Sequence, residues 1–140
     1  APYCVKVGRE LSSLLRPDKL VAYFGRHADL LAAAARLRTC LAGMASQGVP
    51  FTSDLGDDAL LSWATDPAED DEAPGPRRQG SWRGWITTRL AAALATGMAA
   101  GSPLPPSRFA IDRVALDGVD TERWIRPGWL QRQPRFDADY

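Results

Sequence analysis

Cysteine, histidine and lysine are scarce in this chain of 140 residues, which contains two cysteines and one histidine. Cys4 and Cys40 stand far apart and belong to no Cys-x-x-Cys pair, so the usual structural zinc site is excluded. The simplest interpretation is a reduced protein of the cytoplasm, although one disulfide between the two cysteines stays open. Lys6 and Lys19 are the only lysines, so few amines are available as catalytic bases.

Long apolar runs and the common catalytic motifs are also absent. No stretch approaches the roughly 18 apolar residues that a membrane span needs, and no signal peptide opens the chain. The sequence contains no Gly-rich phosphate loop, no HExxH or GxSxG motif and no internal repeat. Its 17 basic and 17 acidic residues cancel, so charge favours neither nucleic acid nor a membrane surface as a partner.

Length and composition predict one domain that spans residues 1–140. With 45% hydrophobic residues, the chain has enough apolar side chain to form a core without disulfides or metals. Because it starts at Ala1, directly before a strand-like segment, we expect an excised domain or one subunit of a split protein. Residues 66–80 are rich in Pro, Gly and charged residues and are expected to form a mobile surface loop.

Hydrophobic periodicity predicts an α+β fold, with a small mixed or mainly antiparallel sheet packed against two to three helices. Strands are expected at 3–7 and 19–24 and, as shorter extended segments, at 49–52 and 60–64. The 19–24 segment is largely apolar, which favours a central strand. All four segments are expected to join one sheet.

Two of the predicted helices have clear boundary signals. One is capped by Asp29 and ends before Gly48, and another covers residues 108–116. The tail that follows has too many Pro and Gly breaks for regular structure. Trp124 and Trp129 are expected to anchor this tail to the body of the protein.

The helix predicted between Ser81 and Gly97 carries an arginine within its apolar stripe. The stripe consists of Trp82, Trp85, Ile86, Leu90, Ala93 and Leu94. Arg89 falls inside it, and a guanidinium directed at a core costs several kcal/mol unless an anion meets it. One explanation is structural: an internal carboxylate such as Asp54 or Asp66 pairs with Arg89, or the arginine snorkels to the rim of the core. The other is functional: Arg89 belongs to a site that receives a phosphate or carboxylate ligand.

Three further candidates lie in the first part of the chain. Arg26 and His27 stand between a predicted strand and a predicted helix, a place where helix N-termini attract anions. A solvated loop histidine is the alternative for His27. Lys6 projects from the polar face of the first strand, where an ordinary exposed lysine is the alternative.

Five sequence blocks resemble one known family in their order and spacing. The blocks are PYCVKVGRE, RPDKLVAYF, GVPFTSDL, SWRGWITTRLAAAL and SRFAIDRVALDGVDTERWIRPGW, and together they resemble the HopA-type effector domain. This family is named for bacterial type III secretion effectors, and similar domains occur in actinobacterial biosynthesis of ribosomal peptides such as class V lanthipeptides and thioamitides. The resemblance covers most of the chain and rests on the succession of blocks.

The resemblance implies a lyase that eliminates phosphate from phosphoserine or phosphothreonine of a peptide, beside a kinase-like partner and without cofactor or metal. By analogy with the type III phosphothreonine lyases, a strand-borne lysine is the base and a histidine two residues later is the acid. Lys6 matches the lysine, but Gly8 stands at the histidine position, and His27 is the substitute we infer. The arginines that would hold the phosphate are Arg26, Arg83 and Arg89.

This chemistry agrees with the residue types present. β-Elimination needs a base for the α-proton, which a desolvated lysine near cations can supply, and cations that hold the leaving phosphate. The alternative function is a non-catalytic effector or scaffold domain that binds peptide and partner proteins, and a weaker one is a cyclase for dehydrated peptide. The expected location is the cytoplasm, or a host cell for a true effector.

Overall fold

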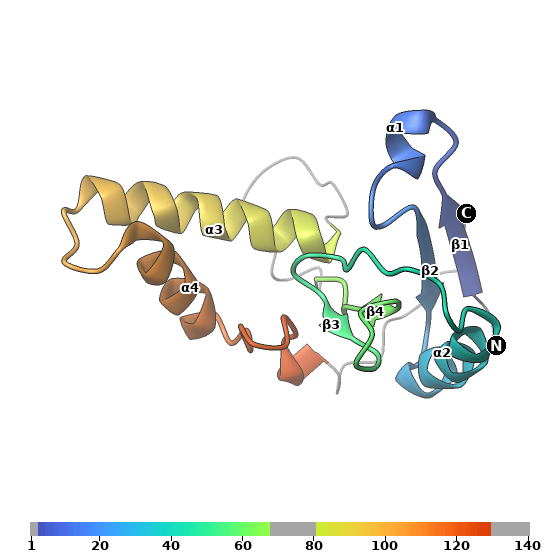
Figure 1. Cartoon of the computed structure of the whole chain (residues 1–140). Helices are drawn as coiled ribbons and strands as arrows, with labels where there is room; N and C mark the ends of the chain where they lie inside the picture. The colour runs from blue at the N-terminus through green and yellow to red at the C-terminus, as the bar shows by residue number, and fades with distance from the viewer. Residues whose placement is uncertain (1–2, 68–80, 130–140) are drawn as a thin grey trace. The chain divides into compact units, whose positions relative to one another are not determined.

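The computed structural model describes residues 3–67 and 81–129, which form an α+β fold with four α-helices and two small antiparallel sheets (Figure 1). The predicted fold class is therefore confirmed. Along the chain the order of elements is β1, α1, β2, α2, β3, β4, α3 and α4, followed by a short 3-10 helix. From residue 68 on, the loop expected at 66–80 lies outside the described residues.

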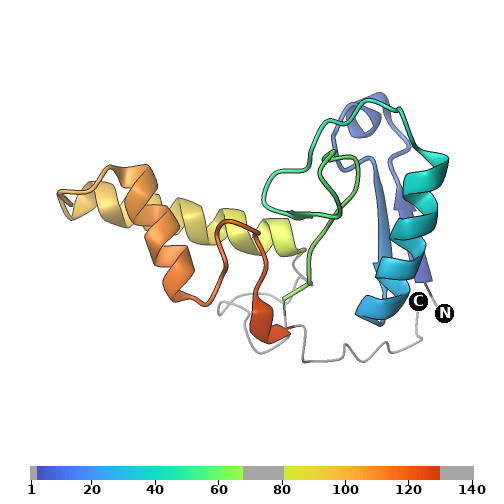
Figure 2. The ribbon, with the colours of Figure 1, turned by 60° about the horizontal axis from the view of Figure 1, so that its bottom comes forward.

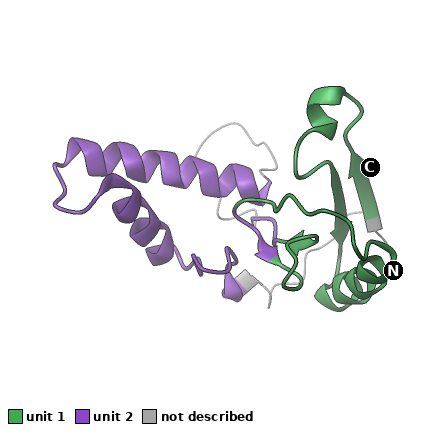
Figure 3. Ribbon diagram, viewed as in Figure 1, with its two compact units in different colours: residues 1–50, 54–63, 132–140 green, residues 51–53, 64–131 purple. Residues whose placement is uncertain are grey.

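The described residues gather into two compact units (Figure 3). Unit 1 contains residues 3–50 and 54–63, and unit 2 contains residues 51–53, 64–67 and 81–129. The expectation of a single domain rested on chain length and stays a prediction.

Unit 1 contains an antiparallel pair of strands, β1 (Tyr3–Val7) and β2 (Leu20–Phe24), joined through the short helix α1 (Leu11–Leu14). Both strand predictions are confirmed, and Lys6 lies opposite Val21 in the register. The prediction of a central β2 is wrong, because among the described residues β1 is the only strand that pairs with it. Its apolar side chains are instead partly covered by α2, which packs against it.

Helix α2 (His27–Cys40) begins two residues before the predicted cap, Asp29. Arg26 occupies the N-cap position, and Asp29 lies in the first turn, where the helix dipole stabilises a carboxylate. Asp29 does not cap the helix, because its two carboxylate oxygens accept hydrogen bonds from Arg26 at 2.8 Å each. The helix also ends well before Gly48, and the chain turns at Gly43, whose φ is +81°.

Strands β3 (Ser53–Asp54) and β4 (Ser62–Trp63) form a second sheet of two strands. The prediction that all four extended segments join one sheet is therefore wrong. The strand predicted at 49–52 is wrong, because that segment contains a turn with left-handed backbone at Phe51 (φ 61°) and β3 begins only at Ser53. Of the segment predicted at 60–64, only Ser62 and Trp63 form a strand. A strand that short offers too little ladder to extend the first sheet.

Helix α3 (Trp82–Ala99) of unit 2 starts where the sequence predicts. The Ser81 hydroxyl oxygen accepts a hydrogen bond from the Gly84 N–H at 3.2 Å, the usual N-cap interaction. The predicted apolar stripe is confirmed at Trp82, Trp85, Ile86 and Ala93, which are buried. Leu94, also assigned to the stripe, is 36% exposed.

Two glycines, Gly97 and Gly101, were expected to end the helix: Gly97 lies inside it, whereas Gly101, with a φ of +61°, follows its C-cap as expected. Helix α4 (Pro106–Leu116) lies beside α3 in both ribbon views (Figures 1 and 2). A β-carbon added to Gly97 would stand 2.8 Å from Cδ1 of Phe109 in α4. Gly97 therefore permits the close approach of two helices and does not terminate one.

The core of unit 2 forms between α3, α4 and the segment after α4. Its buried members are Trp82, Trp85, Ile86, Val114 and Val119. The indole N–H of Trp82 donates to the carbonyl of Phe51 at 2.6 Å. The Trp124 ring meets Phe51 edge-on, with 4.9 Å between ring centroids, so the predicted anchoring by Trp124 is confirmed.

The segment after α4 has more local structure than the sequence predicts. Asp120 and Ile125 form an antiparallel β-bridge, and Pro127–Trp129 forms a turn of 3-10 helix. The side chain of Trp129 lies outside the described part of the chain, so its predicted anchoring role stays a prediction.

Candidate functional site

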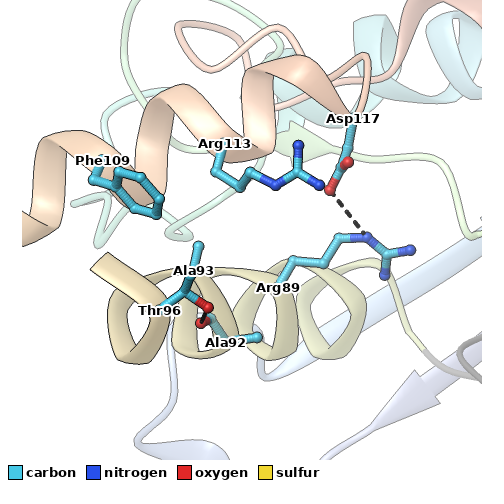
Figure 4. A pocket seen from close by; sticks show the side chains of 7 residues that line it. All are labelled: Arg89, Ala92, Ala93, Thr96, Phe109, Arg113 and Asp117. Atoms are coloured by element: carbon cyan, nitrogen blue, oxygen red, sulfur yellow. Dashed lines mark hydrogen bonds and ion pairs between the residues drawn. The ribbon is translucent and has the colours of Figure 1, made fainter. Parts of the chain in front are cut away.

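Helices α3 and α4 of unit 2 border a groove of about 230 Å³ (Figure 4). Its lining consists of Arg89, Ala92, Ala93 and Thr96 from α3 and Phe109, Arg113 and Asp117 from α4 and its C-cap. The spacings of three and four residues along each helix place these side chains on one face. One end of the groove carries guanidinium and carboxylate groups, and the other carries a phenyl ring, alanine and threonine (Figure 4).

Arg89 contacts both a carboxylate and an aromatic ring at the charged end of the groove. Its Nε lies 3.5 Å from Oδ2 of Asp117, and its Cζ lies 3.6 Å from the centroid of the Trp85 ring. The internal carboxylate beside Arg89 is therefore Asp117 and not Asp54 or Asp66, the two suggested by the sequence. The ring orients the guanidinium through a cation–π contact.

The Arg89–Asp117 pair lies at the rim of unit 2, since its side chains are 27% and 34% exposed. Solvent screens such a pair, which then contributes about 1 kcal/mol or less to stability. Of the explanations for an arginine in the stripe, the structure shows a partner carboxylate at the rim. The alternative, a site that receives a phosphate or carboxylate ligand, stays a prediction.

Arg113 and Asp117 were missed by sequence reasoning. Arg113 extends along the groove toward Asp117 (Figure 4), and it makes no hydrogen bond or ion pair of its own with any residue in 3–67 or 81–129. The spacing of four residues from Phe109 to Arg113 and again to Asp117 was the available signal, because it places all three on one helical face. The described lining of the groove therefore holds two guanidinium groups and one carboxylate.

Trp85 carries a second arginine near its ring. The Cζ of Arg126 lies 5.8 Å from the Trp85 ring centroid, and the Trp82 ring stacks on Trp85 with 5.4 Å between centroids and 14° between planes. The two indoles form a rigid platform at the start of α3, because one face of each is fixed by the other. This platform limits where the guanidinium of Arg89 can move.

Lys6, the predicted base, lies on β1 with an exposed side chain. Its neighbour on the same face of the strand is Cys4, also exposed. Burial is one of the ways in which a lysine becomes a base near neutral pH, and β1 does not provide it in the described residues. The catalytic role of Lys6 stays a prediction.

Arg26 and His27 lie together at the start of α2, as the sequence predicts. Two hydrogen bonds from the Arg26 guanidinium to Asp29, aided by their opposite charges, raise the pKa of Arg26 and lower that of Asp29. The His27 side chain is exposed, and its ring lies 4.6 Å from that of Trp63, tilted by 43°. Asp29 therefore already occupies the fork of Arg26 that the sequence assigned to phosphate.

Arg83, the remaining phosphate candidate, is partly exposed on the first turn of α3, with its Nε atom buried. It precedes Arg89 by six residues, which separates the two side chains by about 120° around the helix. Arg83 does not line the groove. The structure thus does not bring these two arginines together on one face of α3.

The five candidates are divided between the units, with Lys6, Arg26 and His27 in unit 1 and Arg83 and Arg89 in unit 2. In the described part of the chain, no three side chains of His, Cys, Asp or Glu gather as metal ligands would. No helix within residues 3–67 and 81–129 is both long and apolar enough for a membrane span.

Comparison of the chain with known proteins gives no match. No family model, no curated protein and no solved structure matches it. The function must therefore be inferred from the groove.

Proposed function

We propose that the chain is a binding module whose α3–α4 groove receives an anionic residue of a peptide, either a phosphorylated side chain or a carboxylate. The observation that carries the proposal is the charge inside the groove, where among the described residues the guanidinium groups of Arg89 and Arg113 lie with one carboxylate, that of Asp117. Guanidinium groups are the usual partners of phosphate and carboxylate, because their planar donors match two oxygens at once.

The volume of the groove supports a peptide segment as the ligand. At about 230 Å³, the groove is smaller than the 300 to 1,000 Å³ typical of pockets for drug-sized ligands and cofactors. It suits one anionic side chain and a neighbouring residue. This is the non-catalytic alternative predicted from the sequence, a domain that binds peptide and works beside a partner protein.

A second candidate function is the β-eliminating lyase that the family resemblance implies. The same pair of arginines favours it, because a leaving phosphate needs cations around it. The sequence assigned Lys6 as the base, His27 as the acid and a kinase-like protein as the source of the phosphopeptide, and Lys6 and His27 belong to unit 1 and not to the unit that holds the groove. Binding is the stronger proposal, because it needs only groups that already face the groove.

The two free cysteines, Cys4 and Cys40, agree with a cytoplasmic setting.

The test of binding is fluorescence anisotropy of a phosphoserine peptide, its glutamate analogue and its unmodified serine form, titrated with the protein. Arg113→Gln is expected to weaken binding of the anionic peptides about tenfold, since it removes one charged donor. Arg108→Gln is the matched control, because Arg108 lies on the same helix and pairs with Asp112 outside the groove. Equal affinity for all three peptides would exclude an anion site.

Mass spectrometry of the same incubations distinguishes the second candidate. A lyase converts the phosphoserine peptide into its dehydroalanine form with loss of phosphoric acid. A binding module retains the phosphoserine unchanged. If elimination occurs, Lys6→Met must abolish it for Lys6 to be the base.

A further inference from the structure

We propose, as an extension that rests on the proposed function, that the α3–α4 groove recognises a second residue of the peptide, an apolar side chain that binds against Phe109. The groove has two chemically different ends. Arg89, Arg113 and Asp117 form the charged end, Phe109, Ala93 and Thr96 form the other, and Ala92 lies between Arg89 and Thr96 on α3 (Figure 4). A ligand that spans the groove therefore contacts both kinds of surface.

The far end of the groove is apolar even though it includes a threonine. The Thr96 hydroxyl donates to the Ala92 carbonyl within α3 at 2.9 Å, so its proton is already used. The remaining surface is methyl groups and the Phe109 ring. The Thr96 oxygen can still accept a hydrogen bond, but a ligand group that needs a donor would lose water there without gaining a partner, whereas an apolar side chain gains from burial.

The position of the ring is set by the packing of the two helices. Phe109 fits against α3 only because Gly97 has no side chain, since a β-carbon there would stand 3.1 Å from Cγ of the ring. The ring is thus held at the end of the groove and presents a fixed surface to a ligand. Fixed aromatic surfaces bind apolar side chains at low entropic cost.

The distance between the two ends predicts the spacing in the peptide. Arg89 and Thr96 are seven residues apart on α3, which at 1.5 Å per residue is about 10 Å along the helix. An extended peptide advances about 3.3 Å per residue. The apolar residue is therefore expected two or three positions from the anionic one.

The experiment is an anisotropy series with the full chain. A phosphoserine peptide of otherwise Gly and Ser residues carries one leucine, moved from one to four positions away on either side, and a matching series carries glutamate in place of phosphoserine. Leucine two or three positions away is expected to raise affinity about tenfold over glycine, from partial burial of the side chain. The glutamate series shows whether a carboxylate or only a phosphate fills the charged end.

Two variants test whether the leucine of the peptide binds in the groove. Ala92→Leu places a larger side chain in the lining between the two ends of the groove and is expected to remove the preference for leucine while the leucine-free phosphopeptide still binds. Ala95→Leu is the control, since Ala95 is exposed on the same helix but does not line the groove. Both sites are exposed, so neither variant disturbs the core.

The outcomes separate this inference from the proposed function. Phosphopeptides that bind equally well wherever leucine stands overturn the apolar subsite and leave the anion site in place. A leucine preference that persists in Ala92→Leu also overturns it, because the side chain then binds elsewhere. If no peptide of either series binds, the proposed function and the inference that rests on it both fail.

Discussion

Phe109 of α4 lies directly against Gly97 of α3, so close that a β-carbon on Gly97 would stand 2.8 Å from Cδ1 and 3.1 Å from Cγ of the ring. These atoms belong to the base of a ring that is packed between helices, and they cannot move aside as the end of a flexible chain does. The glycine therefore determines how close the two helices come. It also places the ring that closes the apolar end of the groove.

Replacing Gly97 with alanine is expected to destabilise the protein by about 1 to 2 kcal/mol in urea unfolding, because overlap with the ring outweighs the better helix propensity of alanine. Gly84→Ala is the matched control on the same helix, since its β-carbon would meet only the Ser81 hydroxyl at 3.4 Å. It is expected to stabilise by roughly 0.5 to 1 kcal/mol. Equal stability of the two variants would mean that the helices do not meet tightly at Gly97.

Replacing Arg89 with alanine is expected to cost about 1 kcal/mol of stability, because the variant loses a rim ion pair with Asp117 and the contact with Trp85. Its larger effect should be on binding, with at least tenfold weaker affinity for the phosphoserine peptide. Thermal melts with and without phosphate measure the change in stability and the effect of the anion on it. Phosphate is expected to raise the Tm of the wild type more than that of the variant, and a wild type indifferent to phosphate would argue against the site.

Replacing Asp117 with asparagine is expected to strengthen binding of the anionic peptide about three- to tenfold, because it removes the negative charge that Asp117 contributes to the groove. Stability should change by less than about 1 kcal/mol, since the lost ion pair is offset by removing an acidic group from the C-cap of α4. Asp112→Asn is the control, because Asp112 pairs with Arg108 and does not line the groove. Weaker binding by Asp117→Asn would show that Asp117 holds Arg89 in place for the ligand.

The pH dependence of stability should show the titration of the Asp66 carboxyl, which precedes α3. Asp66 is an exposed residue, but the chain around its carboxyl removes part of the hydration of that group and so raises its pKa above the usual 3.8, and a hydrogen bond from the Trp82 N–H at 3.4 Å opposes the rise only in part. The folded state then binds more protons than the unfolded state between 3.8 and the raised value, so stability falls as pH rises through that window. Asp66→Asn should remove this fall and be more stable than the wild type at pH 7.

Urea unfolding between pH 3 and 8 measures this effect, with Asp57→Asn as an exposed control. Asp29 acts in the opposite direction, because Arg26 lowers its pKa below 3.8 and the stability it contributes is lost as pH falls through that lower range. The two windows lie on either side of 3.8 and do not overlap. Parallel curves for wild type and Asp66→Asn would show that the carboxyl of Asp66 is hydrated in the folded state.

Much of the local structure could be read from the sequence. Alternation of apolar residues located β1, and a dense apolar run located β2. The Ser81 cap and the tryptophan spacing located α3 to within a residue at its start. These signals work because strand and helix periods depend on neighbours only a few positions away.

Only part of the candidate site could be predicted, because these signals reach only a few residues along the chain. Arg89 was found because its position in an apolar stripe is a local property of α3. The residues around it belong to α4 and its C-cap: Phe109, Arg113 and Asp117. No residue close to Arg89 in the sequence indicates that these three lie beside it.

The sequence by itself therefore determined the elements of this protein and one unusual arginine, since hydrogen-bonded periods and caps act over three or four residues. The tertiary structure decided what that arginine meets, that Gly97 serves helix packing and not helix termination, and that the short strands form two sheets. Those outcomes depend on which surfaces approach each other in space. Side-chain volume and charge at sites distant in the chain set that approach, and periodicity does not encode them.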